Sequence, residues 1–119
     1  MMVRIIGTRI IIPKGDTGSF SLPRQETNTN YAKFIVQDPL TLENVIEKEI
    51  TLVDNYFVVD LTSEDTRELP AKKYFWDIKS YYEPSFDEDG ILVDALEIHS
   101  YYSAFKHPLF IIKEVIKDV

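Results

Sequence analysis

Residues 73–82, with the sequence KYFWDIKSYY, carry the strongest pattern in the chain. Tyr74, Trp76 and Ile78 recur at every second position, so in an extended strand their side chains lie on one face. The residues between them, among them Asp77, lie on the other face. Aromatic and β-branched residues also favour strands. This stretch therefore predicts a β-strand with one face in a hydrophobic core, and it favours an all-β fold.

Similar short runs precede this stretch, and turn-forming residues separate them. The expected strands cover residues 3–12, 17–22, Tyr31–Gln37, 45–52 and Tyr56–Leu61. Pro13 and Gly15 form a turn after the first run, and Asp38-Pro39 opens another after the third. The third and fourth runs are expected to form an antiparallel hairpin. Close spacing of short strands is typical of a sandwich or barrel.

A short helical turn is expected just before residues 73–82. Thr62 stands three positions before the acidic Asp65, which is the spacing of a capping pair at a helix start, and Pro70 ends the turn. After residue 82, the polar sequence DEDG at residues 87–90 predicts a hairpin loop. Strands are then expected at residues 91–99 and 109–112.

We therefore predict a single domain over residues 1–119, an immunoglobulin-like antiparallel β-sandwich with one short helical turn near residues 62–67. A length of 119 residues falls within the usual size of one domain, and 45% hydrophobic residues supply enough apolar side chains for a core. The side chains expected in this core are Phe20, Phe34, Val36, Val58, Leu61, Tyr74, Trp76 and Ile78.

The composition excludes several classes of function. The chain has no Cys, so disulfides, thiolate metal sites and cysteine nucleophiles are absent. Thirteen Lys and Arg against twenty Asp and Glu give a net charge of −7, which repels a phosphate backbone, and we interpret the pair Lys72-Lys73 as a solvated edge. No apolar stretch approaches the roughly 20 residues of a membrane span, and we find no signal peptide. We expect a soluble protein with no nucleic-acid and no membrane partner.

The residues that could carry chemistry do not form a convincing site. His99 and His107 lack metal-ligand spacing with another His or a carboxylate on a regular element. The aspartates of residues 87–94 suggest calcium, but the loop is too short for an EF-hand and lacks its later Glu. Residues 16–18 read DTG, as in aspartic proteases, without the further signature of that class. We predict no catalytic residue, no metal site and no cofactor.

Aromatic residues are the most promising binding groups. Seven Tyr, seven Phe and one Trp are present, and those that face outward could form a protein interface or a platform on which sugars stack. Both alternatives remain open from the residues alone. Together with two isoleucines near the end of the chain, the interface candidates are Phe75, Tyr82, Tyr101, Tyr102, Ile111 and Ile112.

An ordered set of motifs resembles a known family. Residues 14–20 read KGDTGSF, residues 57–66 read FVVDLTSEDT, Leu69-Pro70 follows, and residues 74–78 read YFWDI. This set resembles the N-terminal domain of phage baseplate upper proteins, in which a Gly-Asp-Thr turn opens the fold and Leu-Pro leads into a Tyr-rich strand. Two departures are Lys72, where the family usually has a turn Gly, and a longer tail after residue 100.

The resemblance implies a function in assembly rather than catalysis. A member of this family is a virion structural protein of the tail or baseplate that docks on other phage tail or baseplate proteins and often forms a homo-oligomer. It is located in the virion, and in the host cytoplasm before assembly. The alternative is a carbohydrate-binding β-sandwich that uses exposed aromatics. An enzyme and an unrelated cellular adaptor are the remaining possibilities.

Overall fold

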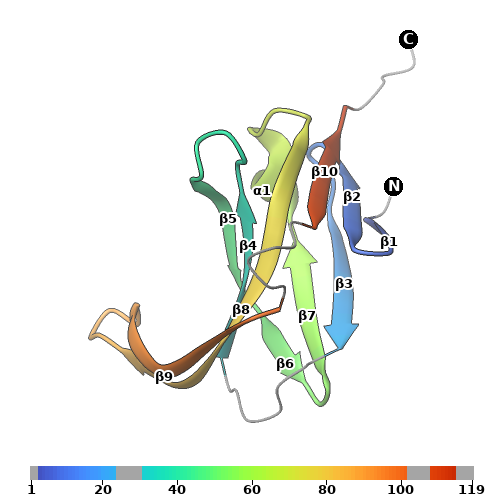
Figure 1. Ribbon diagram of the computed structural model, residues 1–119. Helices are drawn as coiled ribbons and strands as arrows, with labels where there is room; N and C mark the ends of the chain where they lie inside the picture. Colours follow the sequence, from blue (N-terminus) through green and yellow to red (C-terminus); the bar gives the residue numbers. More distant parts are fainter. Residues whose placement is uncertain (1–2, 24–30, 102–107, 115–119) are drawn as a thin grey trace.

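The computed structural model describes residues 3–23, 31–101 and 108–114, which form two β-sheets and one short helix (Figure 1). The strands are β1 Arg4–Ile6, β2 Arg9–Pro13, β3 Gly18–Pro23, β4 Tyr31–Gln37, β5 Asn44–Glu49, β6 Thr51–Val53, β7 Tyr56–Leu61, β8 Lys73–Phe86, β9 Leu92–Ser100 and β10 Leu109–Lys113. The helix α1 covers Ser63–Arg67. In the described residues, no helix is long and apolar enough to cross a membrane. The predicted all-β sandwich with a helical turn is confirmed.

The larger sheet has the strand order β1-β2-β10-β8-β4-β5, with β9 pairing on β8 as well. The smaller sheet has the order β3-β7-β6 and packs against it. Pairing is antiparallel except between β10 and β2, which run parallel, with Phe110 opposite Ile10. The expectation of a purely antiparallel sandwich is therefore wrong at this pair. The immunoglobulin-like arrangement of the strands stays a prediction.

The core lies between the two sheets, and the strand that begins at Lys73 is central to it. Tyr74, Trp76 and Ile78 are at most 3% exposed, as their alternation predicts. Phe34 on β4 contacts the rings of Trp76 at 5.8 Å and Phe20 at 5.6 Å between centroids, so it joins the sheets. Seven of the eight predicted core residues are buried; these are Phe20, Phe34, Val36, Leu61, Tyr74, Trp76 and Ile78.

The eighth prediction, Val58, is wrong by one residue. Val58 is half-buried, whereas the next residue, Val59, has no exposed surface. Val59 is opposite the buried Phe20 in the β3–β7 pair, and opposite residues in an antiparallel pair point to the same face. A run of four apolar or aromatic residues has no alternation of its own, so the neighbouring strand determines which face is buried.

Two predicted strands are each divided in the structure. Residues 3–12 form β1 and β2 because Gly7, with φ of 62°, makes a tight turn between them. Residues 45–52 form β5 in the larger sheet and β6 in the smaller one. The buried Ile50 lies between these strands, and its N–H donates to the Ala32 carbonyl at 3.0 Å. The chain therefore passes from one sheet to the other at a buried residue.

The helix α1 has the cap that its sequence predicts. The Asp65 carboxylate accepts a hydrogen bond from the Thr62 N–H at 2.7 Å and from the Lys48 ammonium at 2.9 Å. The buried Thr66 hydroxyl accepts the Gly15 N–H at 2.8 Å, which ties the helix to the turn after β2. A five-residue helix has little stability alone, so these contacts hold it in place.

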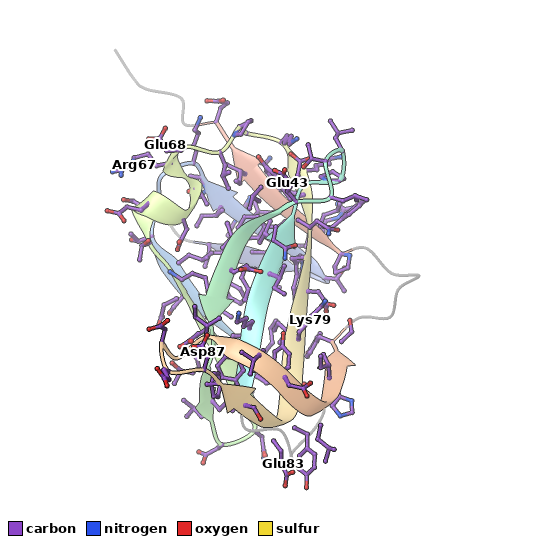
Figure 2. The ribbon with its side chains drawn as sticks, turned by 90° about the vertical axis from the view of Figure 1, so that its left-hand side faces the viewer. Glu43, Arg67, Glu68, Lys79, Glu83 and Asp87 are labelled. Carbon is purple, nitrogen blue, oxygen red and sulfur yellow. The ribbon has the colours of Figure 1, made fainter. Side chains whose placement is uncertain are left out.

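The second half of β8 and most of β9 leave the sandwich as a two-stranded ribbon, which we call the arm, residues 82–98 (Figure 1). β8 pairs with β9 from Lys79 onward, and its pairing with β4 ends at Tyr81 opposite Tyr31, so beyond that point β9 is its remaining partner in the described residues. Glu83 has φ of 47°, and the β8–β9 register shifts between Ser85 and Phe86. These irregularities bend the ribbon. Figure 2 shows Glu83 and Asp87 on this ribbon, well below Glu68 at the other end of the molecule.

Candidate docking surface

The structure describes five of the six interface candidates and places them apart. Phe75 and Ile111 are half-buried on neighbouring strands of the larger sheet, on the face away from the smaller sheet. Tyr82 is half-buried at the start of the arm. Tyr102 lies outside the described residues. These positions do not form one continuous platform with Tyr101, whose ring faces the core.

Two of the candidates serve the core instead. Ile112 is 1% exposed, so its prediction as an interface residue is wrong. The strand β10 lies between β2 and β8 in the larger sheet. Its residues Phe110 and Ile112 point into the core between the two sheets. Tyr101 is half-buried, its ring lies 6.1 Å from Phe57 and 6.3 Å from Trp76, and burial raises the pKa of its phenol. Both side chains stabilise the sandwich.

The arm carries an exposed apolar surface that the sequence analysis missed. Five large hydrophobic side chains of the arm are between 43% and 69% exposed; these are Phe86, Ile91, Val93, Leu96 and Ile98. They occur on both faces, because a two-stranded ribbon has no second layer over most of its length. A signal was present in the sequence, since residues 91–98 are apolar at both odd and even positions, which a strand with one buried face does not require. Large apolar side chains exposed together on one element are a feature of interaction sites in soluble proteins.

The backbone of β9 offers a second means of binding. One edge of β9 pairs with β8 from Ser100 to Leu92. Within residues 3–23, 31–101 and 108–114, no strand pairs with the opposite edge. An unpaired edge presents N–H and C=O groups at strand spacing, and an extended segment of another chain can add to it.

The arm also holds most of the net charge. Residues 82–98 contain six of the twenty acidic residues and none of the thirteen Lys and Arg. The arm therefore carries −6 of the total of −7, and the other residues of the chain carry −1. At the tip, the Asp87 carboxylate accepts the N–H groups of Asp89 and Ile91, both at 2.9 Å, which fixes the turn. A partner of the arm must accommodate both acidic and apolar groups.

A ring cluster anchors the arm to the sandwich. Tyr31 on β4 lies 5.5 Å from Tyr81 and 5.1 Å from Phe86, measured between ring centroids. Burial raises the pKa of Tyr31 to about 12, helped by its hydrogen bond to the Glu49 carboxylate at 3.1 Å. Burial also raises the pKa of Tyr81. Phe86, at the end of β8, therefore contacts the first residue of β4 through its ring.

A small cavity of about 200 Å³ lies where β9 meets the sandwich. It is lined by Phe57, Ile78, Ser80, Ile98, His99, Ser100 and Tyr101. Ser80 is opposite His99 in the β8–β9 pair, and the Ser100 hydroxyl donates to the Asp77 carboxylate. Pockets for drug-sized ligands usually occupy roughly 300–1,000 Å³, so this cavity suits water or a small polar group. In the described residues, no group of three or more His, Asp or Glu could hold a metal ion.

Comparison of the chain with family models, with curated proteins and with solved structures found no match.

Proposed function

We propose that this protein is a non-catalytic docking domain of a phage tail or baseplate, and that it works by binding other protein chains through the arm. The observation that carries the proposal is the exposed apolar surface of residues 82–98 on a ribbon that projects from a well-packed sandwich (Figure 1). Docking needs such a surface, whereas the folding of the sandwich does not.

The energetics of the arm support docking. The side chains of Leu96 and Ile98 are 69% and 58% exposed, so most of their apolar surface is still in contact with water. Full burial of one such side chain contributes about 1.5–3 kcal/mol. Two-stranded ribbons are marginally stable alone. An arm that binds a partner gains both this burial and hydrogen bonds along β9.

The phage setting of the proposal comes from the ordered motifs that resemble baseplate upper proteins. It implies other tail or baseplate proteins as partners, self-association into a homo-oligomer, and a place in the virion after a period in the host cytoplasm. A single-layer ribbon extending from a compact domain suits assembly, because it reaches a neighbour without disturbing the domain that carries it.

The arm favours protein docking over the carbohydrate-binding alternative. A sugar-stacking site presents open ring faces to the ligand. The rings at the base of the arm are packed on one another instead, with Tyr31 and Phe86 at 79° and Tyr31 and Tyr81 at 48°. The exposed residues of β9 are aliphatic, and these contribute burial to a protein contact rather than stacking on a sugar.

Particle composition tests the proposal. Prophage is induced in the organism that carries the sequence, and the amount of this protein relative to the major capsid protein is measured in purified particles. We expect the wild type to be present, and the double variant Leu96→Ser with Ile98→Ser to be reduced about tenfold or more. Leu40→Ser, which changes an 84% exposed leucine in the β4–β5 loop, is the matched control and should be incorporated normally.

Two results would overturn parts of the proposal. If wild-type protein is missing from intact particles, the phage function is wrong. If the double variant enters particles as well as Leu40→Ser does, the arm is not the docking surface.

A further inference from the structure

Two unpaired strand edges of the larger sheet, those of β1 and β9, lie in segments of opposite charge. The described residues 3–15, which include β1 and β2, contain Arg4, Arg9 and Lys14 and no acidic residue. The arm, at the other side of the molecule in Figure 1, contains six acidic residues and no Lys or Arg. The remainder of the sequence therefore has a net charge of −4, and the two extremes lie at separate ends of the fold.

The strand β1 matches β9 in exposure as well as in opposite charge. All three residues of β1 are exposed, and they include the apolar Ile5 at 39% and Ile6 at 55%. β1 pairs with β2 on one edge, and no strand in the described residues pairs with its other edge. Arg4 on β1 and Arg9 at the start of β2 are exposed beside these isoleucines. The edge thus presents unpaired backbone, apolar side chains and positive charge together.

We propose that the β1 edge of one copy of this protein binds the β9 edge of a second copy, so that the chain assembles head to tail. The inference rests on the proposed docking function of the arm and names the occupant of its edge. Arg4 and Arg9 then face the acidic arm; one exposed isoleucine of β1 lies on the face of Leu96 and Ile98, and the other lies on the opposite face with Val93. The strands add by backbone pairing, as in β-strand addition.

A contact between two arms fits the charges less well. Two arms placed edge to edge would bring together two segments that each carry −6, and like charges at short range oppose association. A contact between β1 and β9 joins a segment of +3 to one of −6. Because the two edges differ, the contact is heterologous, and repetition of it gives a ring if the rotation closes and a filament if it does not.

Sedimentation of the purified full-length chain tests this contact. At low salt the wild type should form oligomers whose size rises with concentration. In roughly 1 M salt, where the Debye length is about 3 Å, association should weaken about tenfold or more. The variant with Arg4→Glu and Arg9→Glu should be monomeric at low salt, and so should the variant with Glu88→Lys and Asp94→Lys.

A mixture of the two variants discriminates between contact types. Each variant keeps one intact edge, so the arm of the first can bind the β1 edge of the second, and the pair should stop at a one-to-one heterodimer. In a symmetric contact only one of the two variants would lose self-association, because the other variant keeps that edge unchanged. The control, Asp60→Lys with Glu68→Lys, has the same change in charge as the arm variant, at exposed residues on β7 and just after α1, and should associate like the wild type.

Several outcomes would overturn the inference. The wild type could remain monomeric at low salt at the highest attainable concentration, either variant could associate like the wild type, or the mixture could fail to form a heterodimer. Particle incorporation is a separate measurement, so a protein that enters particles but does not self-associate refutes this contact and leaves the proposed function in place.

Discussion

The sandwich and the arm differ in how many strands flank β8 and in how far their apolar side chains are covered. In the sandwich, β8 has neighbours on both sides and alternates between buried and outward residues, so Tyr74, Trp76 and Ile78 fill the core. In the arm, the same strand has a single partner, and five large apolar side chains of the arm, among them Val93 and Leu96, stay more than 40% exposed. The comparison teaches that an apolar residue in a strand stabilises the fold only where a second layer covers it.

The largest expected effect is in the sandwich, at Trp76. Its indole is 3% exposed, contacts Phe34, and donates a hydrogen bond to the Thr8 carbonyl at 2.9 Å. Trp76→Ala should lower the free energy of unfolding by about 3–5 kcal/mol because it leaves a large cavity. Denaturant unfolding measures this loss.

Leu96→Ala in the arm is the control for this measurement. It removes a side chain that is 69% exposed and should change the free energy of unfolding by less than about 0.5 kcal/mol. If the two variants lose the same free energy of unfolding, Leu96 contributes to the core as much as Trp76 does. The arm would then not differ from the sandwich in how its apolar residues stabilise the fold.

A smaller effect is expected at Thr66, where α1 joins the sandwich. Thr66→Val keeps the shape of the buried side chain but removes the hydroxyl that accepts the Gly15 N–H. The partly buried Gly15 N–H then loses its acceptor, which should cost about 1–3 kcal/mol in thermal or denaturant unfolding. Thr51→Val, at an exposed position on β6, is the matched control and should have little effect. If the loss of unfolding free energy is as small as in the control, the Gly15 N–H has another acceptor.

The smallest effect is expected at the junction of the two regions. Tyr31 has a pKa of about 12, raised mainly by burial, so the fold favours its neutral phenol. This contribution to stability is complete below the ordinary pKa of 10.0 and is lost as the pH rises through about 12. Phe86→Ala should uncover Tyr31 and lower its pKa toward 10.0. Absorbance titration of phenolate, with Tyr31→Phe to assign the signal, measures the shift; an unchanged pKa would mean that Phe86 does not anchor the arm.

The sequence predicted much of the sandwich and little of the proposed docking surface. Alternation at residues 74–78 and the pairing of Thr62 with Asp65 are local patterns, and both are confirmed. The core position of Ile112 was not predictable, because it depends on β10 lying between β2 and β8, which are distant in sequence. The surface of the arm was missed for the same reason, since exposure depends on which strands end early.

By itself, the sequence determined the strand-forming segments, the capped helical turn, most core residues and the absence of cysteine chemistry, because each follows from the order or the kinds of residues. The tertiary structure decided the rest. It decided that residues 45–52 contribute strands to both sheets, that β2 and β10 run parallel, and that the pairing of β8 with β4 stops at Tyr81. The physical reason is that pairing and burial are set by contacts between distant segments, and the alternation within one strand does not specify its neighbour.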